Sequence, residues 1–147
     1  MSIKSRIEED IFDAMRSGDV LRKNTLRMTL SAIKLAEIDR GVQLDDAAYV
    51  AILQKEIKSR RESIVDAERA GRPELVAEAE AEIDILETYL PVQLEQHDLE
   101  IMAREAIGEV GATSARDIGQ VMKVLMPRIQ GRAEGSQASQ IVRNLLG

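Results

Sequence analysis

Apolar residues recur at helical spacing through most of the chain, and capping residues or glycines separate the successive runs. In the first run Ile3, Ile7 and Ile11 share one face, and Gly18 follows as the expected C-terminal cap. The same pattern predicts seven helices, at about residues 3–17, 20–40, 46–70, 73–90, 98–110, 115–126 and 136–146. The alternation typical of a half-buried strand is absent, so the expected fold class is all-α and multihelical.

The longest interruption of the pattern lies between Pro91 and His97, and we interpret it as a domain boundary. It separates an expected four-helix N-terminal subdomain, residues 1–92, from a small three-helix C-terminal subdomain, residues 93–147. A chain of 147 residues is long enough to bury a core in this arrangement.

The second expected helix carries apolar residues on two faces. Leu26, Leu30 and Ile33 lie on one face, whereas Met28 and Leu35 lie on another. Because a helix that is apolar on several sides is usually buried on several sides, we expect this helix to have neighbours on both faces.

The third and fourth helices carry unusual charges. Arg60 falls on the apolar face of the third helix, four residues after Glu56, which predicts an ion pair at a helix–helix seam. Residues 74–87 of the fourth helix hold six acidic side chains and no basic one. This run is either a solvated outer face or a site for a divalent cation, although such sites usually draw ligands from several segments.

The C-terminal hairpin, residues 114–137, has the most specific local pattern. Ser114 with Asp117 three residues later is typical of a helix N-terminus. Pro127 disfavours the helical conformation of the residue before it, so it should end or kink that helix. Gly131 to Gly135 is expected to form a turn, and its amides could also meet a phosphate.

Composition excludes several classes of function. The net charge of −6 argues against broad, non-specific nucleic-acid binding. The chain has no cysteine, and its single histidine, His97, lies in a polar stretch where a solvated loop is expected. We therefore expect no catalytic residue, metal or cofactor. The chain also lacks an apolar run long enough to span a membrane, and its N-terminus alternates charge too early for a signal peptide, so a soluble cytoplasmic protein is expected.

Local basic clusters remain on this acidic chain. From Thr113 to the end there are five basic residues and two acidic ones. Arginine and lysine near the hairpin turn could bind phosphate, or could interact favourably with the dipole of a helix at its C-terminus. A second cluster on the third helix could add contacts, or could be the wet side of an amphipathic helix. The candidate nucleic-acid-binding residues are Lys123, Arg128, Arg132, Arg143, Lys55, Lys58 and Arg61.

Several blocks occur in a characteristic order over nearly the whole chain. They are Thr25-Leu26-Arg27, Ser31-Ala32-Ile33-Lys34, Gln54-Lys55-Glu56-Ile57-Lys58-Ser59-Arg60-Arg61-Glu62-Ser63, Gly71-Arg72, Tyr89-Leu90-Pro91, Gly119-Gln120-Val121-Met122-Lys123 and Gly131-Arg132-Ala133. On these blocks the chain resembles the YqeY family. Three positions depart from that pattern, because Glu134 stands where the family commonly has aspartate, and Ser136 and Ser139 stand where longer or apolar residues are frequent.

The YqeY family is similar to the tail of the B subunit of glutamine-dependent aminoacyl-tRNA amidotransferases. The resemblance implies an all-helical fold with a larger N-terminal and a smaller C-terminal subdomain. In the amidotransferase, which is a carbon–nitrogen ligase with glutamine as amido donor, the tail helps to hold tRNA and other parts perform the chemistry.

Two functions follow from this resemblance. The first is a non-catalytic adaptor that binds the tRNA backbone weakly and in a salt-dependent way. The second is a protein-interaction module that docks on an amidotransferase subunit or another translation component without binding RNA.

Overall fold

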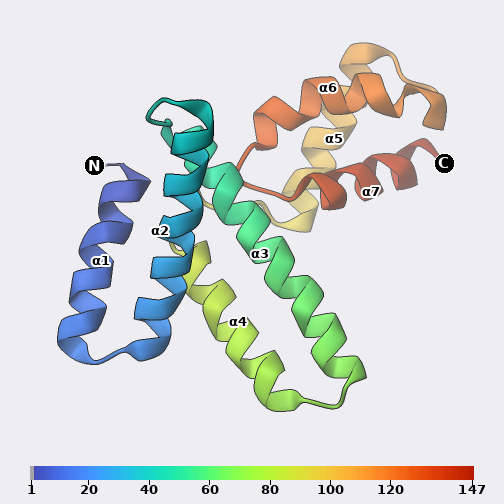
Figure 1. The fold of residues 1–147 in the computed structure, drawn as a ribbon. Helices are drawn as coiled ribbons and strands as arrows, with labels where there is room; N and C mark the ends of the chain where they lie inside the picture. The colour runs from blue at the N-terminus through green and yellow to red at the C-terminus, as the bar shows by residue number, and fades with distance from the viewer. Residues whose placement is uncertain (1) are drawn as a thin grey trace. The chain divides into compact units, whose positions relative to one another are not determined.

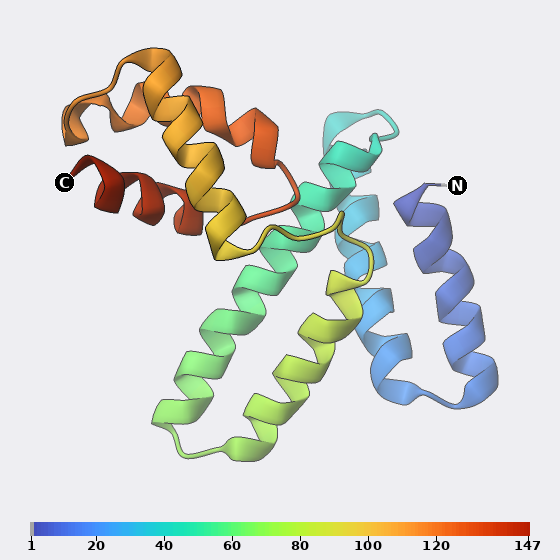
Figure 2. The same ribbon diagram turned by 180° about the vertical axis from the view of Figure 1, so that it is seen from behind.

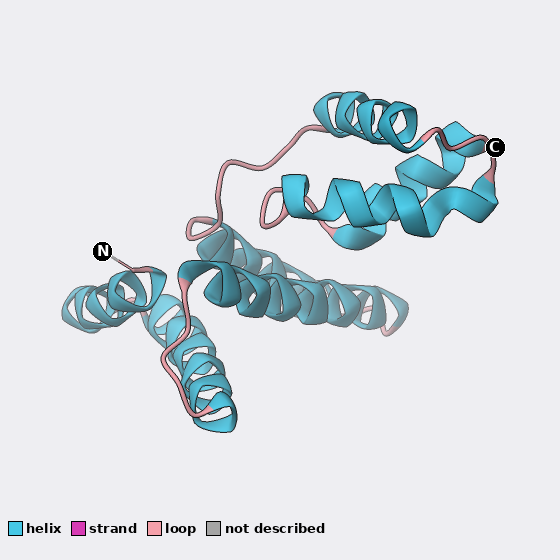
Figure 3. Cartoon of the chain, turned by 90° about the horizontal axis from the view of Figure 1, so that it is seen from above, coloured by secondary structure: helices cyan, strands magenta, loops and turns pink. Residues whose placement is uncertain are grey.

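The computed structural model describes residues 2–147, which form seven α-helices and one short 3-10 helix joined by loops (Figures 1 and 3). In chain order they are α1 (Ile3–Ser17), α2 (Val20–Arg40), α3 (Asp46–Arg69), α4 (Pro73–Glu87), α5 (Gln96–Val110), η1 (Ala115–Asp117), α6 (Ile118–Ile129) and α7 (Gly135–Leu146). The all-helical prediction is confirmed.

The helices group into two compact units. Unit 1, Met1–Leu90, contains α1 to α4, and unit 2, Pro91–Gly147, contains α5, η1, α6 and α7. Each unit has a separate cluster of buried apolar side chains.

Local capping explains the tight turn between α1 and α2. Gly18 has a φ of +74°, a conformation that a residue with a β-carbon adopts only with strain. One residue later, Asp19 Oδ1 accepts a hydrogen bond of 3.1 Å from the backbone N–H of Arg22 at the start of α2. The two residues therefore end one helix and begin the next, as the sequence predicts.

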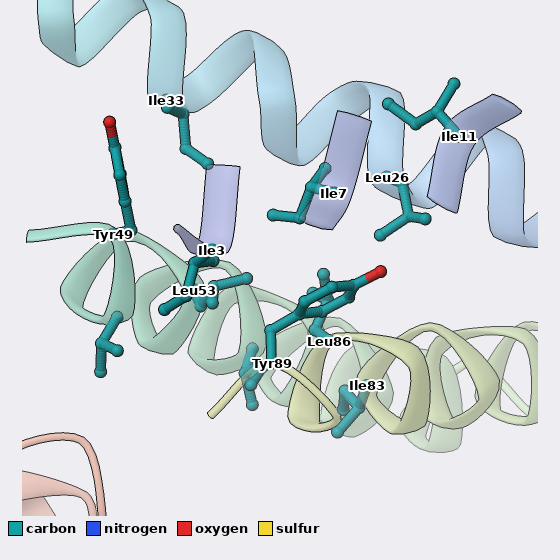
Figure 4. Close-up of a cluster of buried hydrophobic side chains, with 12 residues drawn as sticks. Ile3, Ile7, Ile11, Leu26, Ile33, Tyr49, Leu53, Ile83, Leu86 and Tyr89 are labelled. Carbon is teal, nitrogen blue, oxygen red and sulfur yellow. The ribbon is translucent and has the colours of Figure 1, made fainter. Parts of the chain in front are cut away.

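The core of unit 1 is built from one face of each of its helices. Isoleucines of α1 meet Leu26 and Ile33 of α2, and the cluster continues to Leu53 of α3 and Leu86 of α4 (Figure 4). Tyr49 is also almost fully buried. Burial of so many aliphatic side chains, at roughly 1.5–3 kcal/mol each, supplies the main drive for this unit to fold.

The second apolar face of α2 is exposed. Met28 and Leu35 each keep 60 % of their surface exposed, whereas Leu26 and Ile33 are fully buried. Helix α2 does have neighbours on several sides, since it contacts α1, α3 and α4. The expectation that a neighbour covers the face of Met28 and Leu35 is wrong among the residues that the structure describes. Helical periodicity shows that a face is apolar, but it does not show whether another element covers that face.

Helices α3 and α4 lie side by side as an antiparallel hairpin (Figures 1 and 2), and a buried arginine joins them. Arg60 is only 7 % exposed. Its Nη1 lies 2.9 Å from Glu56 Oε2, and its Nε lies 2.7 Å from Glu82 Oε2. The predicted Glu56–Arg60 pair at a helix seam is confirmed, and Glu82 of α4 completes it.

The acidic run of α4 is therefore not simply a solvated face. Besides Glu82, Glu74 pairs with Arg72 at 2.5 Å and Glu87 with Arg61 at 3.3 Å. Within residues 2–147, groups of three or more histidine or carboxylate side chains suited to a metal ion are not found.

A second polar contact joins α1 to the end of α4. Tyr89 is 2 % exposed, and its hydroxyl donates a hydrogen bond to Asp10 Oδ2. The guanidinium carbon of Arg6 lies 5.1 Å from the centre of the Tyr89 ring, within the range of a cation–π contact. Burial raises the pKa of the Tyr89 hydroxyl well above its usual range, and the hydrogen bond to Asp10 raises it further.

Unit 2 packs α5, α6 and α7 around small and aliphatic side chains. Ala103, Ala106 and Ala138 are fully buried, so the helix backbones approach closely around Leu125 and Ile129. The small residues explain how three helices form a core from few large side chains.

The predicted cap of Ser114 and Asp117 begins the 3-10 helix η1, which leads into α6 at Ile118, and α6 ends later than expected. Asp117 Oδ2 accepts hydrogen bonds from the backbone N–H groups of Thr113, at 3.0 Å, and Ser114, at 3.4 Å. Pro127 lies inside the helix, which continues to Ile129. Of the two outcomes predicted for Pro127, an end of the helix is wrong, because Ile129 is fully buried and its packing favours continued helix. A kink at Pro127 stays a prediction.

In the described part of the chain, the helices are too short or too polar to cross a membrane.

The buried seam predicts a large effect of Arg60→Ala. The change leaves the Glu56 and Glu82 carboxylates close together without their shared cation, which should lower the free energy of unfolding by about 3 kcal/mol. Urea unfolding measures the difference. The matched control is Lys58→Ala on the exposed side of the same helix, for which we expect a change within about 0.5 kcal/mol. Equal unfolding midpoints for the two variants would contradict the seam.

Tyr89 predicts a pH-dependent difference between the parent protein and Tyr89→Phe. At neutral pH the variant should lose about 1–2 kcal/mol, because the hydrogen bond to Asp10 is removed. The raised pKa keeps the hydroxyl protonated in the folded state, so this stabilisation is fully present below the ordinary tyrosine pKa of about 10. Above it, the parent's advantage should fall by up to about 1.4 kcal/mol per pH unit. Urea unfolding of both proteins from neutral to alkaline pH checks this, and a constant difference would contradict it.

Candidate nucleic-acid interface

Arg132 lies in the turn between α6 and α7 and holds the segment that follows Leu90. Its Nε donates a hydrogen bond of 3.2 Å to the carbonyl oxygen of Val92. Its own carbonyl accepts a bond of 2.8 Å from the backbone N–H of Leu94, and Gln93 Nε2 donates one of 2.8 Å to the carbonyl of Gly131. Arg132 is half-buried by these contacts, so its first role within unit 2 is structural.

Arg128 is engaged by a carboxylate of a neighbouring helix. Its Nη1 and Nη2 lie 3.1 Å and 2.6 Å from the two carboxylate oxygens of Glu109, near the end of α5. This bidentate hydrogen bonding holds the pKa of the Glu109 carboxyl below its usual range. A phosphate would have to compete with Glu109 for this arginine.

Lys123 and Arg143 point away from the core of unit 2. Lys123 lies two residues from buried Leu125 on α6, and Arg143 lies two residues from buried Ile141 on α7. At about 100° per residue, each cation is on the side of its helix opposite the core. Both are exposed, and neither forms an ion pair among residues 2–147.

The cations of α3 divide in the same way. Lys55 and Lys58 are exposed and form no ion pair among the described residues, whereas Arg61 Nη2 lies 3.3 Å from Glu87 Oε1 of α4. The helix presents a basic outer side, but one of its three cations also joins the α3–α4 hairpin.

His97 lies in a different place from the one expected. It belongs to the first turn of α5 and not to the preceding loop, and it is exposed. The solvated position predicted for it is confirmed, although the loop is not.

The structure therefore places the seven candidate cations in unlike surroundings. Lys55, Lys58, Lys123 and Arg143 are exposed cations, while Arg61, Arg128 and Arg132 are bound to groups of the protein. Sequence reasoning missed the groups that hold Arg128 and Arg132. Glu109 is distant in sequence from Arg128, and the acceptor on Val92 is a backbone oxygen, so neither leaves a local pattern to read.

The fold and these surfaces define an all-helical protein of two units. The chain belongs to the family described as Yqey-like protein, whose match covers residues 4–146. The resemblance expected from the sequence blocks is confirmed.

Several curated relatives of this chain carry the same name. The "Altered inheritance of mitochondria protein 41, mitochondrial" of Pyrenophora tritici-repentis is 32 % identical over 97 % of this chain and 80 % of that protein. The proteins of the same name from Lachancea thermotolerans and Kluyveromyces lactis are each 39 % identical over 58 % of this chain. In these two, the matched segment is about half of the relative's length, 46 % and 49 % respectively.

These relatives correct one expectation. Their printed name assigns them to mitochondria, so the predicted cytoplasmic location is wrong by this comparison.

Proposed function

We propose that this protein is a non-catalytic adaptor that holds tRNA through contacts with its phosphate backbone. In this proposal the two units are the larger and smaller subdomains that the resemblance to the amidotransferase tail implies. Kinship with that carbon–nitrogen ligase is itself part of the proposal, and the ligase chemistry would belong to other proteins.

The exposed cations of unit 2 are the observation that carries the proposal. Lys123 and Arg143 are exposed on α6 and α7, which share one small core. Neither side chain forms an ion pair with another of the described residues. Unit 2 has six basic and seven acidic side chains, whereas unit 1 has fourteen and nineteen. Unit 2 is therefore nearly neutral and repels a polyanion less than unit 1 does.

Few contacts are available, so the binding should be weak. Lys55 and Lys58 of unit 1 could add to the contacts of Lys123 and Arg143. Two to four phosphate contacts give a slope of log K against log salt of about −2 to −4. With only three aromatic residues in the chain, recognition by base stacking should contribute little.

A second candidate function is a protein-interaction module. It is favoured by the exposed apolar residues on α2, because surfaces of that kind more often contact protein than RNA backbone.

The test of the adaptor proposal is a salt titration of total tRNA against an equal-length DNA duplex, with the full chain. We expect a preference for tRNA that weakens steeply toward physiological salt. The double variant Lys123→Glu/Arg143→Glu should lower tRNA affinity by at least about tenfold at low salt, without a change in melting temperature.

The control is Arg104→Glu/Arg116→Glu, which changes the charge of unit 2 by the same amount at other exposed positions. An equal loss in both double variants would show an effect of net charge alone and would refute the assigned residues. Absence of tRNA binding by the parent at low salt would refute the adaptor proposal.

A further inference from the structure

An exposed apolar row follows the outer face of α2. Met28, Leu35 and Ile38 are 60 %, 60 % and 75 % exposed, and Val42, just beyond the end of the helix, is 60 % exposed. We call these four residues the outer row. Within the helix, Met28, Leu35 and Ile38 are seven and three residues apart, which is the spacing by which one helix packs along another in a coiled coil. Val42 follows the helix end at Gly41 and extends the exposed apolar surface.

A basic rim borders the outer row on one side only. It consists of Lys23, Arg27 and Lys34, which are four and seven residues apart and so follow one flank of α2. Among residues 2–147 none of the three forms an ion pair with a carboxylate. Arg27 instead places Nη2 3.6 Å from the sulfur of Met15 on α1.

The opposite flank of the row is different. It carries Ala32, Ala36 and one acidic residue, Asp39. At the start of α2, a hollow lined by Met15, Val20 and Lys23 lies beside the turn after α1. The outer row is thus an apolar surface with the basic rim along one edge. The side chains that flank the apolar face of a second helix packed on the row would lie beside this rim.

A second copy of this chain fits the surface poorly. If two outer rows met in an antiparallel two-fold pair, the basic rim of one copy would lie beside the basic rim of the other. Like charges at such a contact are unfavourable. A parallel pair would set three cations of each copy against Asp39 alone.

An anionic membrane is also a poorer match. Helices that lie in a membrane surface usually carry cations along their whole polar face, and here the cations follow one flank of the row. Unit 1 also carries more acidic than basic side chains, which would oppose approach to an anionic surface.

We propose that the outer row and its basic rim dock an acidic amphipathic helix of a partner protein. Its apolar residues would cover the row, and its glutamate or aspartate residues on one flank would face Lys23, Arg27 and Lys34. This surface lies on unit 1 and uses none of the cations assigned to tRNA, so it is independent of the proposed adaptor site.

The experiment uses the full chain and a synthetic amphipathic helix of about three heptads, with leucine at each a and d position. One peptide carries glutamate along the flank, and a matched peptide carries lysine there. We expect the acidic peptide to bind at least about tenfold more tightly by calorimetry, since only its flank complements the basic rim.

Two double variants test the outer row and the basic rim separately. Leu35→Ser/Ile38→Ser should lower the affinity for the acidic peptide at least about tenfold without lowering the melting temperature, because both side chains are exposed. Its control is Val65→Ser/Leu75→Ser, which alters exposed apolar residues elsewhere in unit 1. Arg27→Glu/Lys34→Glu should reverse the preference, so that the basic peptide binds better.

Three results would overturn the proposal. If the two peptides bind equally well, or if neither binds, an acidic helix is not the partner. Failure of Leu35→Ser/Ile38→Ser to weaken binding would remove the row. The last result is that the acidic peptide does not bind, while another activity of the parent is lost in Leu35→Ser/Ile38→Ser. If that activity is binding to phosphatidylglycerol vesicles, the row is assigned to a membrane. If it is dimerisation in sedimentation, the row is assigned to a second copy.

Discussion

A single buried arginine determines how the central hairpin of unit 1 is held. Arg60 is a buried cation between α3 and α4, and taking a cation out of water is costly unless anionic groups pair with it. Glu56 and Glu82 meet that requirement through different guanidinium nitrogens. Because α3 contributes Tyr49 and Leu53 to the core, the apolar packing depends on the register that this polar contact favours.

The same hairpin offsets part of the repulsion among the acidic side chains of α4. Six acidic side chains on one short helix would repel one another, but three of them are paired with arginines. The exposed pairs are worth little individually, whereas the Glu82 pair is shielded by the seam. Some arginines are therefore paired with carboxylates of the protein itself, and fewer cations remain exposed for a partner.

Local rules predicted what depends on local contacts. Helical periodicity and capping found every helix, and the position of Arg60 on an apolar face predicted its pairing with Glu56. Contacts between distant segments were not accessible in this way. Three features depend on which elements become neighbours: the pairing of Arg60 with Glu82, the pairing of Arg128 with Glu109, and the exposure of Met28. The spacing of residues along one helix does not show which elements become its neighbours.

Functionally, the two units offer surfaces of different chemistry, with exposed cations on unit 2 and an apolar track with a basic edge on unit 1. The seam of Arg60 with Glu56 and Glu82 is a separate feature, which favours one register of the α3–α4 hairpin. The most direct test of the seam that fixes this register in unit 1 is a double-mutant cycle between Arg60→Ala and Glu82→Ala, measured by urea unfolding. Our account predicts a coupling free energy of about 1–3 kcal/mol between the two positions. Additive effects, with a coupling near zero, would contradict it.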